Sequence, residues 1–263
     1  MIFMQFIFSS RLISLLFLLL VTCLISCKDG SVTPTSQSIK KTDTCIVIKV
    51  TETRTGLSPG TTPMTFEYDA QKRLIKKVYY FENDLSDNSI AFEYDAKDRL
   101  IKASSVGIEP NTYTDRYEYN DQGRLAKSIR QYNNYSVTST MQYDNNGNRI
   151  RMDVENSNGH PYYFTYSYAD GNLAESRTYS NSSVSVSTYE YYLDKENIVK
   201  EELLRVYNLS ASNKNLLKKV HTDSPILGDI NFSYEFTAKG YLSKVMSQSP
   251  AFTTTTVYEY DCN

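Results

Sequence analysis

The sequence predicts an all-β protein, an antiparallel meander of about eight or nine hairpin repeats that curls into a spiral, a partial barrel or a sandwich. Three observations predict this fold. A triplet of a large apolar, a polar and an aromatic residue recurs about every 25 residues, and a turn signal follows each triplet. The composition also favours strands, with 23 Tyr, 11 Phe and no Trp. Aromatic residues suit a pleated surface that is buried on one face.

The triplets define the repeat. Their last residues follow one another at intervals of 23 to 26, apart from one interval of 45. The long interval is close to two units, so a degenerate copy around Tyr207-Asn208 and Leu216 to Val220 would make nine units instead of eight. The clear triplets are Phe66-Glu67-Tyr68, Phe92-Glu93-Tyr94, Tyr117-Glu118-Tyr119, Met141-Gln142-Tyr143, Tyr166-Ser167-Tyr168, Tyr189-Glu190-Tyr191, Tyr234-Glu235-Phe236 and Tyr258-Glu259-Tyr260.

A turn and a second alternating run follow each triplet. In the third copy Asn120 stands first in the turn and Gly123 fourth. An Asn or Asp side chain at the first position accepts a hydrogen bond from the backbone two residues on, and Gly adopts the left-handed conformation without a Cβ penalty. Where Lys72 or Asp98 holds the glycine position, we expect a modest strain. Asp170-Gly171, in a shorter copy, predicts a two-residue type I′ turn.

The alternation predicts one aromatic and one charged face. A period of two places Phe66 and Tyr68 on one face and Glu67 on the other, and every copy repeats this. A sheet of about sixteen strands exceeds the usual ~10, so its twist should curl it over the aromatic face. Lysines of the second strands are expected to face the triplet acids across strands; they are Lys76, Lys102, Lys127, Lys200 and Lys244.

Residues 1–26 are predicted to be an export signal. Arg11 precedes the apolar run from Leu12 to Ser26, as in a signal-peptide core. The alternative, an uncleaved membrane anchor, would require roughly 20 apolar residues with a sharper charged boundary. The end of the run, Leu24-Ile25-Ser26-Cys27, resembles the lipobox of bacterial lipoproteins. This resemblance implies that Cys27 receives a diacylglycerol and becomes the mature N-terminus, which lipid chains then anchor in a membrane.

The residues after the lipobox predict a tether. Lys28 follows the cysteine where lipoproteins of the inner membrane carry Asp, so an outer-membrane location is expected, facing the periplasm or the cell surface. Residues 27–44 then form the lipidated N-terminus and a flexible segment rich in Gly, Ser, Thr and Pro. Residues 45–263 form the β domain.

The remaining cysteines predict a disulfide. Cys23 leaves with the signal and Cys27 is lipidated, so Cys45 and Cys262 remain in an oxidising location. A bridge between them requires that the two ends of the array meet. The alternative is two free thiols.

The turn pattern carries a family resemblance. The motif Tyr-Asp-x-x-Gly-Arg-Leu, seen as Tyr119-Asn120-Asp121-Gln122-Gly123-Arg124-Leu125, resembles the YD repeat of Rhs and teneurin-type proteins over residues 65–263. Large Rhs proteins wrap such repeats into a hollow shell around a toxin. This chain is much shorter and shows no counterpart of their protease-like core motif, so it is more similar to short YD-repeat lipoproteins. The resemblance implies carbohydrate binding as one function of such repeats.

No arrangement of residues predicts catalysis, a metal or a cofactor. His160 and His221 stand alone in predicted loops, without ligands at metal spacing. Acidic residues are numerous, but nothing singles out a pair for glycoside hydrolysis. One near-motif places acids and amides at positions 1, 3, 5 and 12 of a calcium loop, but Arg149 stands where such a loop needs Gly, so a hairpin turn is predicted; its residues are Asp144, Asn146, Asn148 and Glu155.

The tyrosines have two interpretations. Regular placement in every triplet fits a packed core, and a ligand platform is the alternative. Tyrosines outside the triplets are better candidates for a ligand-binding surface that stacks on sugar rings, although packing at edges and links is the other interpretation. These candidates are Tyr79, Tyr80, Tyr113, Tyr132, Tyr135, Tyr162 and Tyr163.

Together these features predict a non-enzymatic envelope lipoprotein that binds or scaffolds a glycan or another envelope protein. Its partners are the membrane, through the lipid, and that ligand. Nucleic acid is not expected, because basic residues alternate with acidic ones and the formal net charge is −2. Two alternatives stay open: a shell or accessory component of a polymorphic toxin system, and a polysaccharide-acting enzyme whose site the sequence does not reveal.

Overall fold

The structure is a computed structural model that describes residues 45–80, 88–107, 112–181, 183–197, 213–224 and 226–262. Sixteen antiparallel strands lie in these residues, and each pairs with the next along the chain. The strands are β1 (Ile46–Gly56), β2 (Gly60–Tyr68), β3 (Leu74–Tyr79), β4 (Asn88–Tyr94), β5 (Leu100–Val106), β6 (Tyr113–Tyr119), β7 (Leu125–Tyr132), β8 (Ser136–Tyr143), β9 (Arg149–Asn156), β10 (Tyr162–Ala169), β11 (Asn172–Ser180), β12 (Ser183–Glu196), β13 (Asn215–Thr222), β14 (Asp229–Phe236), β15 (Leu242–Gln248) and β16 (Phe252–Asp261).

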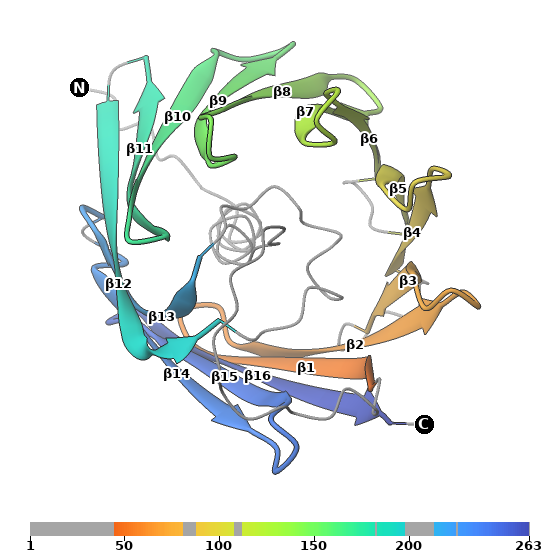
Figure 1. The fold of residues 1–263 in the computed structure, drawn as a ribbon, viewed down its shortest axis with the longest axis vertical. Coiled ribbons are helices and arrows are strands. Elements are labelled where there is room, and N and C mark those ends of the chain that lie inside the picture. Colours follow the sequence, from red (N-terminus) through yellow and green to blue (C-terminus); the bar gives the residue numbers. More distant parts are fainter. Residues whose placement is uncertain are drawn as a thin grey trace, which may run out of the picture.

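The sheet closes into a barrel (Figure 1), because β16 pairs with β1 as well as with β15. The predicted antiparallel meander is confirmed, but the predicted spiral, partial barrel and sandwich are wrong. Pairing runs along the whole of β1, from Ile46 opposite Asp261 to Gly56 opposite Phe252. Closure gives the backbone groups of both outer strands hydrogen-bond partners, which no open curl provides.

The first strand completes the last repeat. Each triplet up to the seventh lies on an even-numbered strand and pairs with the odd-numbered strand that follows. The eighth triplet, on β16, has β1 as its partner instead. There Lys49 contacts Glu259 at 2.7 Å, in the same way that Lys76 contacts Glu67 at 3.5 Å in the first hairpin. The two ends of the chain therefore build one repeat unit together.

The described residues form eight units, one of the two predicted counts, and the second half of the predicted ninth unit belongs to another unit. The run Leu216 to Val220 belongs to β13, which is the hairpin partner of the triplet strand β12. The long interval in the sequence is therefore a long β12–β13 connection inside one hairpin. Tyr207-Asn208 lies outside the described residues, as do the predicted export signal and tether, residues 1–44 with Cys27, and Lys200.

The turns form as the sequence predicts. The Asn120 side chain accepts a hydrogen bond from the backbone two residues on, at 3.1 Å, and Gly123 has φ of 76°. Lys72 and Asp98 take the same left-handed conformation, with φ of 61° and 58°. Asp170 and Gly171 both have positive φ, which is the type I′ geometry.

The outer wall of the barrel carries the charged face. A bulge beside each triplet acid lets Leu74 face inward while Lys76, two residues on, faces outward. The predicted pairs of Lys76, Lys102, Lys127 and Lys244 with triplet acids are confirmed, and each is worth only tenths of a kcal/mol because it is exposed. The outer pairs are Glu67–Lys76, Glu93–Lys102, Glu118–Lys127, Glu190–Lys218, Glu235–Lys244 and Glu259–Lys49.

The aromatic face lines the interior. Phe66 and Phe92 are 9% and 5% exposed and pack with Leu74 and Leu100 in one cluster on β1 to β6. A second cluster lies around Leu173 and residues of β13 to β16. The core interpretation of the triplets is confirmed for these residues.

A belt of tyrosine hydroxyl groups links each unit to the one before it. The Tyr94 hydroxyl donates to the Leu74 carbonyl at 2.8 Å, one unit back. Burial raises the pKa of Tyr119 in this belt to about 12, so the phenol keeps its proton. Seven of the eight units make this bond, and Phe236 lacks the hydroxyl. The bonds are Tyr68 to Val47, Tyr94 to Leu74, Tyr119 to Leu100, Tyr143 to Leu125, Tyr168 to Arg149, Tyr191 to Leu173 and Tyr260 to Leu242.

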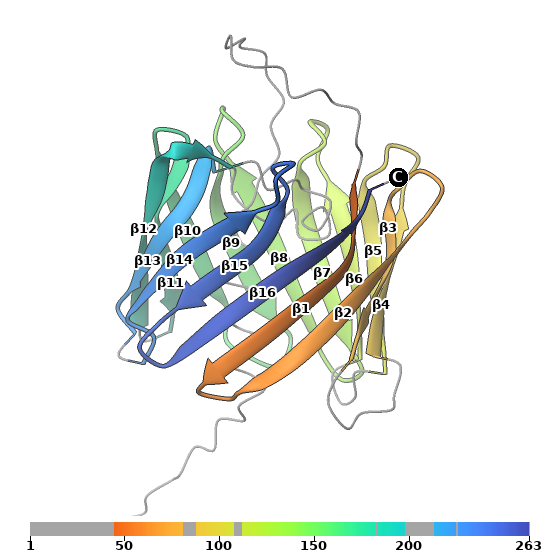
Figure 2. The ribbon, with the colours of Figure 1, turned by 90° about the horizontal axis from the view of Figure 1, so that it is seen from below.

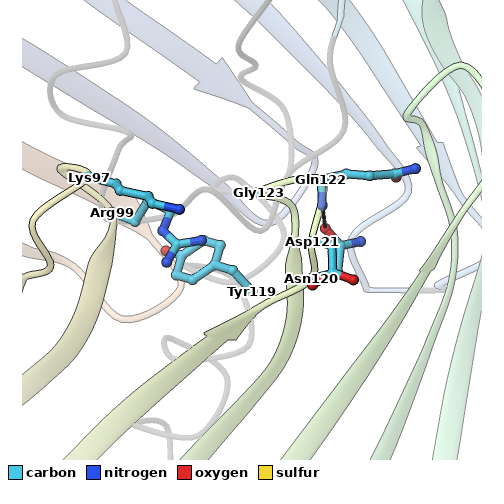
Figure 3. A pocket seen from close by; sticks show the side chains of 7 residues that line it. All are labelled: Lys97, Arg99, Tyr119, Asn120, Asp121, Gln122 and Gly123. Carbon is cyan, nitrogen blue, oxygen red and sulfur yellow. Dashed lines mark hydrogen bonds between the residues drawn. The ribbon is translucent and has the colours of Figure 1, made fainter.

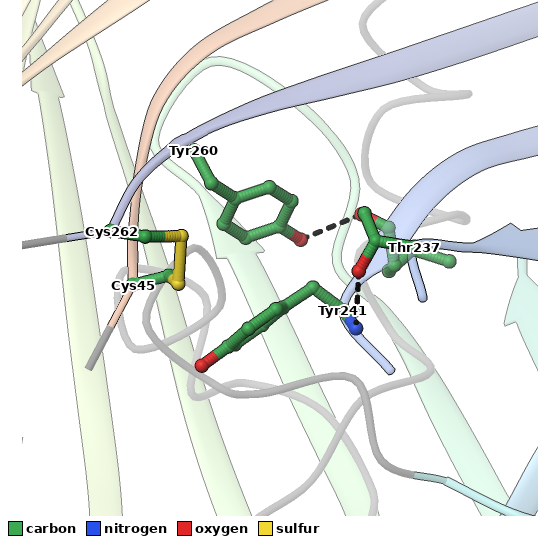
Figure 4. Close-up of a disulfide and its surroundings, with 6 residues drawn as sticks. Cys45, Thr237, Tyr241, Tyr260 and Cys262 are labelled. Carbon is green, nitrogen blue, oxygen red and sulfur yellow. Dashed lines mark hydrogen bonds between the residues drawn. A yellow bond between two sulfur atoms is a disulfide. The ribbon is translucent and has the colours of Figure 1, made fainter. Parts of the chain in front are cut away.

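The two ends of the barrel differ. The turns after the triplets lie at the end where β1 begins and β16 ends, which we call the turn rim (top of Figure 2); we call the other end the far rim. The disulfide between Cys45 and Cys262 lies at the turn rim, beside the rings of Tyr241 and Tyr260 (Figure 4), and joins residues 217 positions apart. No helix in the described part of the chain has the length and apolar character needed to span a bilayer.

Replacing Tyr94 by Phe should lower the free energy of unfolding by about 1 kcal/mol, because the variant loses one part-buried hydrogen bond and keeps the ring. Urea unfolding of the two proteins measures the difference. Tyr80→Phe is the control, since its hydroxyl makes an exposed contact of 3.3 Å with Thr65. Equal effects of the two substitutions would show that the belt does not stabilise the barrel.

Candidate functional site

The predicted tyrosine surface is divided between the two faces of the wall. Five of the seven candidates lie on the interior side near the far rim, where they pair with or stack on other inward-facing residues: Tyr79, Tyr113, Tyr132, Tyr135 and Tyr162. Tyr80 is 50% exposed on the outside, and Tyr163 stacks on Tyr179 of the outer wall at 4.5 Å. The seven candidates therefore do not share one face of the wall.

Three of these residues form the tyrosine cluster, which we define as Tyr113, Tyr132 and Tyr135. Tyr113 begins β6 and lies opposite Tyr132 at the end of β7, with ring centroids 6.0 Å apart. Tyr135 follows the tight turn after β7 and stacks on Tyr132 at 4.3 Å, with 15° between the ring planes. Burial, and then the Tyr132 phenol, raises the pKa of Tyr135 and of Tyr162 on β10. The hydroxyl groups therefore stay protonated and can donate hydrogen bonds.

A part-buried ion pair lies next to the tyrosine cluster on the inner face of the wall. Arg130 of β7 donates two hydrogen bonds to Asp115 of β6, at 2.7 and 2.8 Å, and its guanidinium lies 4.1 Å from the centre of the Tyr113 ring. Burial by itself would lower the pKa of Arg130, but the bonds to Asp115 raise it well above its usual range. The Tyr117 hydroxyl also donates to Asp115, at 3.2 Å. Both charges are thus fixed in place.

The arrangement suits a polar ligand with a flat apolar face. Aromatic rings supply contact area, while phenol, guanidinium and carboxylate groups supply donors and acceptors of hydrogen bonds. The signal in the sequence was the presence of tyrosines outside the triplets. The sequence did not predict a role for Asp115 and Arg130, because its acids were expected in turns and on the solvent face. That expectation is wrong for Asp115 and for Glu52, which lie on the inner face.

Glu52 lies on the inner side of β1, opposite Thr62 of β2. Burial raises the pKa of its carboxyl group, against the opposing effect of Lys77 and Arg54. Lys77 faces inward as well, with its ammonium 4.6 Å from the centre of the Tyr79 ring. The alternation of Val50, Glu52 and Arg54 in the sequence could have predicted this inner charged group.

A cavity of about 530 Å³ lies at the turn rim, between the turns of the second and third units (Figure 3). The Arg99 guanidinium lies over the Tyr119 ring at 4.7 Å and contacts Asp95 at 2.6 Å. The opposite wall is the β6–β7 turn. No pattern in the sequence predicted this cavity. Its lining consists of Lys97, Arg99, Tyr119, Asn120, Asp121, Gln122 and Gly123.

The two histidines and the calcium-like loop are accounted for by local structure. His160 lies in the β9–β10 connection, as predicted. His221 was predicted to lie in a loop but lies in strand β13, and its ring contacts Asp229 of β14. The Asp144 side chain accepts the backbone hydrogen bond of Asn148 at 2.8 Å, as a hairpin turn requires. Among the described residues, no three His, Cys, Asp or Glu side chains form a group that could hold a metal.

The sequence matches no protein-family model, and no curated protein matches it. A crystal structure of a porin-like protein from Bacteroides uniformis is similar over 82% of this chain and 98% of that chain, with 14% identity and a TM-score of 0.58. Matched chains of TcdB2-TccC3-Cdc42 and of the Photorhabdus luminescens Tc holotoxin pore cover 76% of this chain, with 12% and 15% identity and TM-scores of 0.35 and 0.29. This chain spans only 13% and 8% of those chains. The porin-like structure shares the barrel fold. The TM-scores of the toxin chains are too low to support a conclusion about this chain.

Replacing Asp115 by Asn should lower the free energy of unfolding by about 3 kcal/mol, because it leaves the Arg130 charge part-buried without its anion. Glu118→Gln on the same strand pair is the control: it removes an exposed acid that faces Lys127, and should cost less than about 1 kcal/mol. Chemical unfolding measures both. Similar small effects would show that the inner pair is not a structural support of the tyrosine cluster.

Proposed function

We propose that the protein is a lipid-anchored, non-enzymatic binding protein of the outer membrane, of the short YD-repeat type, whose barrel binds a glycan at the tyrosine cluster. The observation that carries this proposal is the gathering of Tyr113, Tyr132 and Tyr135 around the Arg130–Asp115 pair on the interior side of the far rim. These three tyrosines are among those outside the triplets, which the sequence had made candidates for a ligand-binding surface.

The chemistry of the cluster fits a sugar. A pyranose ring presents an apolar face of C–H groups that packs on a tyrosine ring, and hydroxyl groups at its edge that exchange hydrogen bonds with charged side chains. Tyr135 is half-buried at the end of the stack, with Tyr132 on one side of its ring. The stacked rings and the fixed ion pair are rigid before a ligand arrives, which reduces the entropy cost of binding.

The position of the chain ends supports anchoring at the opposite rim. The proposed lipid is on Cys27, and the barrel begins at Cys45 on the turn rim. The residues from 28 to 44 can span at most about 60 Å when fully extended. In this proposal the tether joins the barrel at the turn rim, and the tyrosine cluster lies at the far rim, away from the point of attachment.

The charged outer wall supports a barrel that stands in water. Barrels that cross the outer membrane expose an apolar band to lipid, whereas here the outer face carries rows of Glu–Lys pairs such as Glu93–Lys102 at 2.7 Å. We therefore assign attachment to the lipid on Cys27 and not to the wall. The fold shared with the porin-like protein agrees with an envelope location.

Replacing Cys27 by Ser should move the protein from the membrane fraction to the soluble fraction, because the acceptor of the lipid is lost. Detergent partitioning of cell fractions, read by immunoblot, measures this. Cys45→Ser is the control, since that thiol is bonded to Cys262 and should not affect anchoring. A Cys27→Ser protein that stays in the membrane would contradict the lipid anchor.

Replacing Tyr135 by Ala should weaken glycan binding about tenfold or more, because a stacking ring is lost from the end of the cluster. A screen of the wild-type protein on immobilised oligosaccharides identifies the ligand, and calorimetry then gives the affinity. Tyr80→Ala, which removes an exposed tyrosine of the outer wall, should leave it unchanged. The proposal fails if no oligosaccharide binds, or if the two variants weaken binding equally.

A further inference from the structure

The first three repeat turns place an arginine in the same position. Arg73, Arg99 and Arg124 each end a turn, and each guanidinium lies over the ring of the last tyrosine in the next unit. The distances from guanidinium carbon to ring centroid are 5.3, 4.7 and 5.7 Å. These three sites can therefore be compared directly, because their backbone and their stacking partners match.

At the first site, the next unit supplies a carboxylate. Arg73 donates through Nε to Asp69 of its own turn at 2.7 Å, and through Nη1 to Asp98 at 2.8 Å. Asp98 occupies the fourth, left-handed position of the next turn, with φ of 58°. This site shows that the space between an arginine and the next turn accepts a carboxylate.

At the second site, that carboxylate is missing. Arg99 contacts Asp95 of its own turn through Nε and Nη2, at 2.7 and 2.6 Å. The position equivalent to Asp98 is Gly123, and a Cβ built on Gly123 would meet no atom within 4 Å. Within the described part of the chain, no group accepts a hydrogen bond from Arg99 Nη1. The cavity at the turn rim opens at this point (Figure 3).

At the third site, the arginine itself fills the space. Arg124 Nη1 donates to the backbone carbonyl of Asp144 at 3.3 Å. A Cβ on Gly147 would lie 3.2 Å from the Arg124 guanidinium carbon, so the arginine already occupies the space in front of this glycine. Of the three sites, the second alone combines a glycine with open space in front of the guanidinium.

We propose that the cavity binds the carboxylate of an acidic sugar, which pairs with Arg99 as Asp98 pairs with Arg73. The Lys97 ammonium, for which the described residues offer no acidic partner, supplies a second cation at the cavity wall. The Asn120 and Gln122 side chains supply amides for the sugar hydroxyls, and Asp121 is a carboxylate that can accept from them. A volume of about 530 Å³ holds a sugar ring besides its carboxylate.

This inference rests on the proposed function, because it names the class of glycan that the protein binds, one that contains uronic acid units, and adds a second contact site for it at the turn rim. Its key variant is Gly123→Asp, which restores the carboxylate that the first site contains. The left-handed conformation at this position tolerates Asp, as Asp98 shows. Gly240→Asp is the matched control: Gly240 holds the equivalent position in another turn, has φ of 81°, and has open space around its Cβ. In the unit before Gly240, the position that Arg99 holds in its own unit is occupied by Leu216, which is buried and uncharged. An acid at position 240 therefore has no arginine of this kind to pair with.

The experiment titrates the full-length protein in detergent with tetragalacturonic acid and, separately, with a neutral galactose tetramer. The wild-type protein should bind the acid more tightly, and Gly123→Asp should weaken that binding about ten- to hundredfold, as expected for the loss of a charge-assisted contact to Arg. Gly240→Asp should bind like the wild type. Circular dichroism shows that both variants fold.

Several outcomes would overturn the inference. The inference is wrong if Gly123→Asp binds tetragalacturonic acid as tightly as the wild type does, or if the wild type binds the neutral and acidic tetramers equally. It is also wrong if acetate or phosphate competes as strongly as the sugar acid, because the cavity would then be a site for a free anion. If the neutral tetramer binds and Tyr135→Ala weakens that binding, the proposed function stands and the acidic-sugar site does not. If Gly123→Asp weakens binding of the acidic tetramer and Tyr135→Ala does not, the acidic-sugar site stands and the tyrosine cluster is not the glycan site.

Discussion

The hydrogen bond from a tyrosine hydroxyl to a carbonyl of the preceding unit is the interaction on which the barrel depends. Neighbouring strands pair through their backbones wherever a sheet forms, but this bond sets where one hairpin stops relative to the next, because the Tyr94 ring reaches the Leu74 carbonyl only in one register. The bond is repeated in seven of the eight units, from Tyr68 on Val47 to Tyr260 on Leu242, and holds each of these hairpins in register with the one before it. The rim cavity and its arginines follow from that alignment.

Closure gives the same interaction to the first and last units. Because β1 serves as the second strand of the eighth hairpin, Val47 presents its carbonyl to Tyr68 in the same way that Leu74 does to Tyr94. The disulfide between Cys45 and Cys262 stands where the other units have a turn. A covalent link at this point restricts the unfolded chain, which in the loop-entropy description stabilises a closed barrel by up to about 5 kcal/mol.

The same repeat supplies both candidate sites by departing from its own pattern. In the β6–β7 hairpin, an acid and an arginine pair with each other on the inner face, and the extra tyrosines gather next to them at the far rim. At the turn rim, Gly123 replaces the acid that Asp98 provides one unit earlier. In a structure whose regular positions serve packing and registration, positions that break the regularity are those at which a ligand can be recognised.

The local features could be predicted from the residues alone: the hairpin turns with Asn120 and Gly123, the outward acids and lysines, and the aromatic inner face. These depend on backbone preferences and on a period of two, which act within a few residues. The sequence also predicted that the ends bearing Cys45 and Cys262 come together. The closure of the sheet, the inward position of Asp115 and Glu52, and the glycine opposite Arg99 became clear only from the folded barrel. Those outcomes depend on contacts between residues far apart in the sequence, which the pattern within one repeat does not encode.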